Sequence, residues 1–125
     1  MSDMAQMKDN VSYMKDFKPL SAEEMGAIAR VTAIYKGLDM IPCTACHYCV
    51  EENHCPMDIK IPELFAAMNT KKVFNDWNQN MYYGIITKDS GKASACIECG
   101  GCETVCPQHL EIRSLLKDVA AEFEK

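Results

Sequence analysis

The sequence predicts an all-α fold in which two cysteine loops lie between helices. No run of alternating apolar and polar residues, bounded by turn residues, indicates a strand. The cysteines fall into two groups with a cysteine-free stretch between them, and each group leads into a helical pattern. The clearest helix lies near the C-terminus, where apolar side chains recur at the steps of one helix face: Ile112, Leu115, Leu116, Val119, Ala120 and Phe123.

The remaining helix signals follow in order along the chain. Residues 21–24 read Ser-Ala-Glu-Glu, a capping box in which the serine and a glutamate each satisfy a free backbone N–H, and Gly37 supplies a stop. Pro62 favours the first turn of a second helix, where its missing N–H costs nothing. A third helix is expected from about Lys72 to about Thr87. We expect these helices to pack inward through Met25, Ile28, Ala29, Thr32, Ile34, Leu64, Phe65, Met68, Val73, Trp77, Met81 and Ile85.

Size and charge limit the functions that fit this chain. Its 125 residues suit one domain, and its net charge of −5 argues against nucleic acid as a partner, because phosphate binding needs a basic patch. The N-terminus lacks the cationic start and apolar run of a signal peptide, and no stretch reaches the about 18 apolar residues of a membrane span. We therefore expect a cytoplasmic protein, whose eight cysteines stay reduced and hold metal.

The second cysteine group has the spacing of iron–sulfur ligands. Cys96, Cys99 and Cys102 are separated by two residues each, and Cys106 follows after three more, directly before Pro107. Three cysteines at such gaps can wrap a short loop around three corners of a cubane, while the fourth points away and reaches a neighbouring cluster. This is the run found in bacterial two-cluster ferredoxins, and it predicts [4Fe–4S] binding.

The first group repeats this arrangement with one change. Cys43, Cys46 and Cys49 keep the two-residue gaps, but five residues instead of three precede Cys55, which is again followed by Pro56. We expect the insert, within residues 50–54, to form a bulge in the loop, because a slightly longer loop costs little free energy.

The paired Cys-Pro endings predict that the two groups exchange their last ligand, as in two-cluster ferredoxins. In this hypothesis all eight thiolates are cofactor ligands, and no residue has a catalytic role. One cluster takes Cys43, Cys46, Cys49 and Cys106, and the other takes Cys96, Cys99, Cys102 and Cys55.

Other uses of these thiols fit the sequence less well. Structural zinc sites usually show two separated Cys-x2-Cys pairs, not a triplet followed by Cys-Pro. A disulfide framework needs an oxidising compartment. A [3Fe–4S] centre usually lacks one of the cubane's ligands, and none is missing here.

Residues beside the cysteines have supporting roles in this interpretation. His47, His54 and His109 are near the ligands, but every cluster corner already has a thiolate. Of the three, His54 is the candidate for an additional ligand, because it adjoins Cys55, the cysteine after the longer gap. We expect five apolar neighbours to shield the clusters from water: Ile59, Ile61, Ile97, Val105 and Leu110.

Three segments together resemble the ferredoxin-like extension at the C-terminus of iron–sulfur aldo/keto reductase family proteins. They are residues 41–49, 61–65 and 96–110, which carry both cysteine triplets and the Ile-Pro-Glu-Leu-Phe helix start. The similarity runs from about Met1 to the end of the chain. Residues 1–10 look like the tail of the last barrel helix of such a reductase, and residues 16–20 look like the linker that follows it.

The resemblance implies an α-helical ferredoxin domain at residues 21–125 with two [4Fe–4S] clusters, preceded by a helix tail and linker at residues 1–20. The family's NADPH-binding (β/α)8 barrel holds its catalytic residues, and this chain is too short to contain one. We therefore predict an electron-transfer module and not an enzyme, which relays single electrons to or from a partner oxidoreductase or reductase barrel. Two alternatives stay open: a fragment or subunit of such a reductase, and a domain whose clusters are structural staples.

Overall fold

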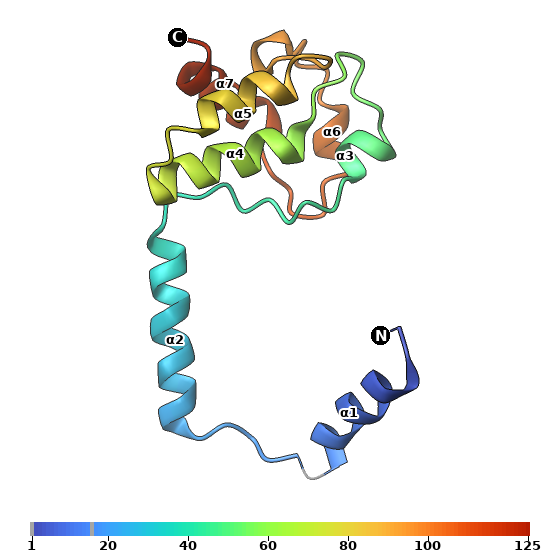
Figure 1. Ribbon diagram of the computed structural model, residues 1–125, viewed down its shortest axis with the longest axis vertical. Coiled ribbons are helices and arrows are strands. Elements are labelled where there is room, and N and C mark those ends of the chain that lie inside the picture. The colour runs from blue at the N-terminus through green and yellow to red at the C-terminus, as the bar shows by residue number, and fades with distance from the viewer. Residues whose placement is uncertain (1, 16) are drawn as a thin grey trace. The chain divides into compact units, whose positions relative to one another are not determined.

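The computed structural model describes residues 2–15 and 17–125, which form two compact units (Figure 1). The first unit ends at Gly37, and the second comprises Leu38–Lys125. Met1 and Asp16, which belong to the predicted helix tail and linker, lie outside the described residues. The division after Gly37 comes later in the chain than the domain boundary expected after Leu20, and the domain start at residue 21 stays a prediction.

The first unit consists of α1 (Met4–Lys15) and α2 (Ala22–Gly37). The capping box of α2 is confirmed, because Ser21 N donates to Glu24 Oε2 at 2.7 Å and Glu24 N donates to Ser21 Oγ at 3.2 Å. Hydrogen bonding to the Glu24 carboxyl from the backbone N–H of Ser21, and then from the Ser21 side chain, lowers the pKa of that carboxyl from its usual value.

The expectation that α2 packs inward is wrong within this unit. No described residue of α1 or α2 is buried, and Met25, Ile28 and Ile34 are all exposed. The physical reason is size, since a unit of fewer than about 40 residues rarely encloses a core of its own.

The second unit is built from helices and short helical turns: α3 (Tyr48–Glu51), α4 (Ile61–Phe74), α5 (Gln79–Ile86), the 3-10 turn η1 (Ala93–Ala95), α6 (Gly101–Thr104) and α7 (Ile112–Phe123). α4 packs against α5 and α7, while α3 packs against α6 (Figure 1). Over residues 2–15 and 17–125 no strand forms, and the one β-type contact is an isolated parallel bridge between Ile59 and Gly91. The predicted all-α fold class is confirmed.

The core of the second unit lies between α4 and α7 and confirms the apolar faces expected of both helices. Pro62 occupies the first turn of α4, and Leu64, Phe65 and Met68 are buried behind it. α7 spans the predicted range and buries three of its apolar residues, Ile112, Leu116 and Val119.

The single helix expected from about Lys72 to about Thr87 is wrong. α4 continues to Phe74, where the chain breaks at Asn75 in a left-handed conformation with φ of 50°. Asp76 then accepts hydrogen bonds from the backbone N–H of Asn78 (3.0 Å) and from Nε2 of Gln79 (2.8 Å), which starts α5. Asn and Asp favour such breaks because their side chains bond nearby backbone groups.

This break changes which side of the segment is buried. Trp77 is 75% exposed, and Met81 and Ile85 are exposed as well, although the helical spacing predicted them to face inward. Tyr83 takes the inward position instead, and its ring stacks on Phe123 of α7 with a centroid separation of 4.8 Å.

Two polar contacts hold the loops to these helices. The Asn69 side chain clamps the chain before the first cysteine loop, since it accepts from Ile41 N at 2.7 Å and donates to Ile41 O at 2.8 Å. The Glu124 carboxylate accepts hydrogen bonds from the Tyr83 hydroxyl and from the backbone and hydroxyl of Ser94. Burial alone would raise the pKa of Glu124, but the bonds from Ser94 and Tyr83 outweigh it and lower the pKa.

None of the helices in the described part of the chain combines the length and the apolar composition that a membrane crossing requires.

Candidate functional site

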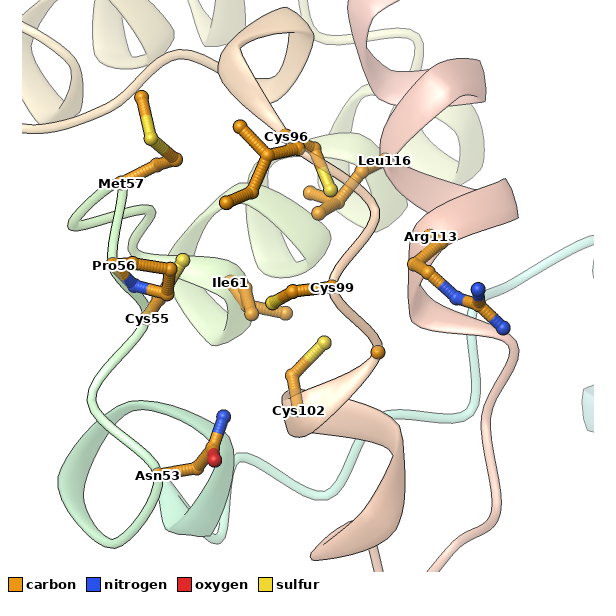
Figure 2. A pocket seen from close by; sticks show the side chains of 12 residues that line it. Asn53, Cys55, Pro56, Met57, Ile61, Cys96, Cys99, Cys102, Arg113 and Leu116 are labelled. Atoms are coloured by element: carbon orange, nitrogen blue, oxygen red, sulfur yellow. The ribbon is translucent and has the colours of Figure 1, made fainter.

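Two cavities in the second unit are each lined by four cysteines. The first cavity is drawn in Figure 2. These groupings are the two sets that the sequence predicted to share a cofactor, although the ligation itself stays a prediction. Cys55, Cys96, Cys99 and Cys102 line the first cavity, and Cys43, Cys46, Cys49 and Cys106 line the second.

The first cavity brings together two distant parts of the chain. Figure 2 shows the sulfur atoms of its four cysteines around a common space beside Ile61. Cys55 comes from the segment before α4, Cys96 and Cys99 come from the loop before α6, and Cys102 lies in α6 itself. Each cavity therefore takes three thiols from one cysteine group and one thiol from the other.

The two cysteine loops repeat the same backbone conformation. Ala45 and Glu98 have φ of 50° and 57°, and His47 and Gly100 have φ of 65° and 77°, at matching places between the cysteines. Left-handed residues turn successive N–H groups toward the inside of a loop and form concavities for anions, including iron–sulfur groups. The repeat of this strained conformation indicates that both loops are shaped for the same anionic group.

The repeat continues into the helices that follow. The residues before α4 and α7, Lys60 and Glu111, have nearly the same backbone angles, with φ and ψ of −80° and 69° against −76° and 68°. Each helix then begins with a buried isoleucine, Ile61 or Ile112, whose N–H donates to the residue two before it at 2.9 Å. Ile61 lines both cavities, and Ile112 lines the second.

The longer gap in the first group is accommodated where α3 meets α6. The insert does not form an isolated bulge: the N–H groups of Glu52 and Asn53 both donate to Tyr48 O, which extends the short helix α3 by a turn. The Asn53 side chain then lies against Gly101, where a Cβ atom would come within 2.5 Å of Asn53 Nδ2, and it lines the first cavity. Glycine at position 101 leaves the space that the insert needs.

Burial controls the protonation of the cysteines. Burial raises the pKa of Cys49 to about 12 and that of Cys102 to about 11, with smaller contributions from neighbouring thiols and, at Cys102, from Glu103. Burial also raises the pKa of Cys43. These thiols are protonated near neutral pH, so a metal must displace their protons when it binds.

The residues present fit a polynuclear cluster better than a single ion. Among the described His, Cys, Asp and Glu side chains, no three surround a point closely enough to hold one metal ion, as a zinc site would require. The thiols are instead spread around apolar cavities, with Leu116 beside the first and Phe65 beside the second. Soft thiolates in an apolar shell are the surroundings that [4Fe–4S] clusters take.

The structure sorts the other residues singled out in the sequence. His47 lines the second cavity, whereas His54 and His109 are exposed and belong to the lining of neither. Of the five expected shielding residues, Ile61, Ile97 and Leu110 line a cavity, while Ile59 and Val105 do not.

Several lining residues escaped the sequence analysis. Met57, Arg113 and Leu116 line the first cavity, and Phe65 and Gln108 line the second. When the two copies are aligned at their Cys-Pro pairs, Met57 matches Gln108 and Phe65 matches Leu116, so the same positions of the repeat line both cavities.

Comparison with models of protein families identifies the family of this chain. The family model described as 4Fe-4S dicluster domain matches residues 42–110, a stretch that contains all eight cysteines. Comparison with curated proteins and with solved structures finds no match.

Proposed function

The chain belongs to the 4Fe-4S dicluster domain family and is an electron-transfer iron–sulfur module, and on that premise we propose that it holds two [4Fe–4S] clusters, one in each cavity. The observation that carries this proposal is the lining of the cavities. Two cavities each have four thiols around them, and together they use every cysteine in the chain.

The proposed ligands follow from the same lining. Three thiolates of each cluster come from one loop, and the fourth comes from the Cys-Pro pair of the other group. Cys55 and Cys106 are thus the residues that link the two sites.

Each bound cluster would supply one-electron chemistry at its site. The chain's own contribution is to hold the group by its thiolates, to exclude water with Ile61, Leu116, Phe65 and Ile112, and to aim backbone N–H groups at its sulfur atoms.

We further propose that the partner is an oxidoreductase in a reducing compartment, the cytoplasm. The support is the resemblance to the extension of iron–sulfur aldo/keto reductases, whose barrel would be the electron donor or acceptor. Anaerobic capture with the tagged chain, followed by a test for NADPH-dependent bleaching of the clusters, examines this. A captured partner that binds no redox cofactor would contradict it.

The first experiment is iron and acid-labile sulfide analysis on anaerobically purified protein, with a visible spectrum before and after dithionite. We expect about eight irons and eight sulfides per chain, and a brown colour that bleaches on reduction. About four irons and four sulfides per chain would mean that the chain binds one cluster and not two. Zinc without sulfide would contradict it, and clusters that do not bleach would indicate a structural staple.

The ligand exchange is tested by two single substitutions. Cys106→Ala should release the cluster bound to Cys43, Cys46 and Cys49, and Cys55→Ala should release the cluster bound to Cys96, Cys99 and Cys102. Each variant serves as the control for the other. If Cys106→Ala removes only the cluster of its own group, the exchange is wrong.

A further inference from the structure

The two cavities differ in the charged residues placed at equivalent positions of the repeat. Residues 61–63, which lie six to eight positions after Cys55, are Ile-Pro-Glu. Residues 112–114, at the same distance after Cys106, are Ile-Arg-Ser. α4 therefore carries a carboxylate in its first turn, whereas α7 carries a guanidinium.

The second cavity lies beside a carboxylate, that of Glu63, which forms no ion pair with a lysine or arginine among the described residues. Glu63 is close enough to Cys43 to add to the rise in the pKa of that thiol, and its Oε2 is buried without a hydrogen-bond partner. Its Oε1 lies 3.9 Å from Nδ1 of His47. Lys60 is close enough that Glu63 adds to the rise in its pKa, but the larger cause is Asp58, to which its Nζ is bound at 2.7 Å. No lysine or arginine is among the described residues that line this cavity.

The first cavity also has a carboxylate beside it, but that carboxylate is paired. Glu103 follows Cys102 and contributes to the high pKa of its thiol. Arg113 binds Glu103 through Nε at 2.9 Å, through Nη2 at 2.8 Å and through its backbone N–H at 2.9 Å. The arginine lines the cavity, with its guanidinium turned away from the sulfurs and 3.8 Å from where a Cβ of Gly100 would lie (Figure 2).

We propose that this difference makes the two redox sites unequal: Glu63, which has no direct ion pair with a lysine or arginine, makes a cluster in the second cavity the stronger reductant, and the Glu103–Arg113 pair keeps a cluster in the first cavity easier to reduce. Adding an electron makes a cluster more negative, so a nearby unpaired negative charge opposes reduction, and a paired one opposes it less. Net charge around a cluster is one of the factors that set its potential.

The proposal gives electron flow through the chain a direction. One electron would pass from the second cavity to the first, with one site oxidised as the other is reduced and no proton transferred. The electron enters from an external one-electron donor and leaves to an external acceptor, and the unequal potentials keep it at the first cavity until it leaves.

This inference rests on the proposed function, so iron and sulfide contents are measured first on every variant. The main experiment is an EPR-monitored redox titration of the fully loaded protein at pH 8. NMR spectra of the partly reduced protein then assign each potential to one cavity, because the hyperfine-shifted β-proton signals of the cysteines show which cluster has been reduced. Glu63→Gln should raise the lower reduction potential, and Arg113→Gln should lower the higher one. Both substitutions should therefore reduce the difference between the two potentials.

Two controls separate a local effect from a change in net charge. Lys72→Gln removes a positive charge from the last turn of α4, at a residue that lines neither cavity and pairs with the exposed Asp39. Glu122→Gln removes a carboxylate that pairs with Lys71. Both controls should leave the two potentials unchanged.

Several results would overturn the inference while leaving the proposed function intact. These are equal potentials in the parent protein, shifts in the controls as large as in the test variants, or no shift with Glu63→Gln. If Arg113→Gln fails to take up iron, Glu103→Gln replaces it and should raise the higher potential, because the arginine is then left unpaired; an unchanged potential there would also overturn it.

Discussion

Burial divides the cysteines within each triplet, and it does so in the same way in both loops. The last member, Cys49 or Cys102, is buried, whereas the middle member, Cys46 or Cys99, is exposed. A thiol reacts with alkylating agents as its thiolate, so burial that raises the pKa also suppresses reactivity. The metal-free protein should therefore show reactivity that depends on position in the loop.

Alkylation of the metal-free, reduced protein by iodoacetamide, followed site by site by mass spectrometry, tests this. With a pKa of about 12, roughly one Cys49 thiol in ten thousand is ionised at pH 8. We expect Cys49 and Cys102 to react much more slowly than Cys46 and Cys99, with the rate at Cys49 rising about tenfold per pH unit from pH 8 to pH 10. Uniform rates at all four would mean that the cavities form only when the cofactor binds.

The sequence identified the eight cysteines and their grouping because ligand spacing is a local property. It did not identify Arg113 or Asn53 as residues at the first cavity, because their positions depend on how α7 and the insert fold back onto the second cysteine loop. Nor did spacing predict which thiols are buried, since burial depends on residues distant in sequence.

The segment between Cys55 and α4 packs closely against the chain at Gly91. Gly91 N donates to Asp58 O at 3.0 Å, and Gly91 faces Ile59 in the isolated bridge. A Cβ added at Gly91 would lie 2.1 Å from the backbone oxygen of Met57, which cannot move without shifting the loop that carries Cys55.

Gly91→Ala should therefore destabilise the protein, by roughly 1–3 kcal/mol or more, because backbone must shift to relieve the overlap. Gly84→Ala is the matched control: it lies within α5, and a Cβ there meets nothing within 4 Å. This control should stabilise by about 0.5–1 kcal/mol, since alanine loses less backbone entropy in a helix. Anaerobic thermal unfolding of both loaded variants measures the effects, and equal shifts for both would contradict the assigned contact.

Helix ends marked by local side-chain chemistry were predictable, and a helix break inside an apolar pattern was not. The Ser21 capping box and Pro62 each determine a start through contacts with adjacent residues. Between α4 and α5, the apolar spacing of Val73, Trp77 and Met81 suggested a continuous helix, and the Asn75-Asp76 pair that interrupts it was overlooked. Apolar periodicity alone does not show which side of a helix finds a partner.

At the scale of the whole chain, the core and both cavities belong to the second unit. The described residues that are buried all lie between Ile41 and Val119, and the lining of both cavities lies between Cys43 and Leu116. The pairing of the cysteine groups was predictable from their repeated Cys-Pro endings. The grouping of α2 with the first unit was not predictable, because the apolar spacing of α2 resembles that of a core helix.

A shortened chain of residues 38–125 should consequently bind the same iron and sulfide as the full chain and unfold at a similar temperature. The first unit supplies no described buried residue and no cavity lining, so its removal should cost the second unit little. Metal analysis and thermal unfolding of the two chains side by side provide the test. A large loss of iron from the shorter chain would show that the first unit stabilises the sites.

The crossing of the two cysteine groups also affects how the protein can be assembled. Cys106 completes a cavity whose other thiols begin at Cys43, so that cavity stays open until nearly the whole second unit has been synthesised and folded. Cys55 likewise completes the other cavity, whose remaining thiols are Cys96, Cys99 and Cys102, so both cavities form when the two cysteine groups come together. Bringing these distant segments together has a single entropic cost, and that one event forms both cavities. Cluster insertion should then be cooperative, with few half-loaded chains, and oxidative loss of one cluster should hasten loss of the other.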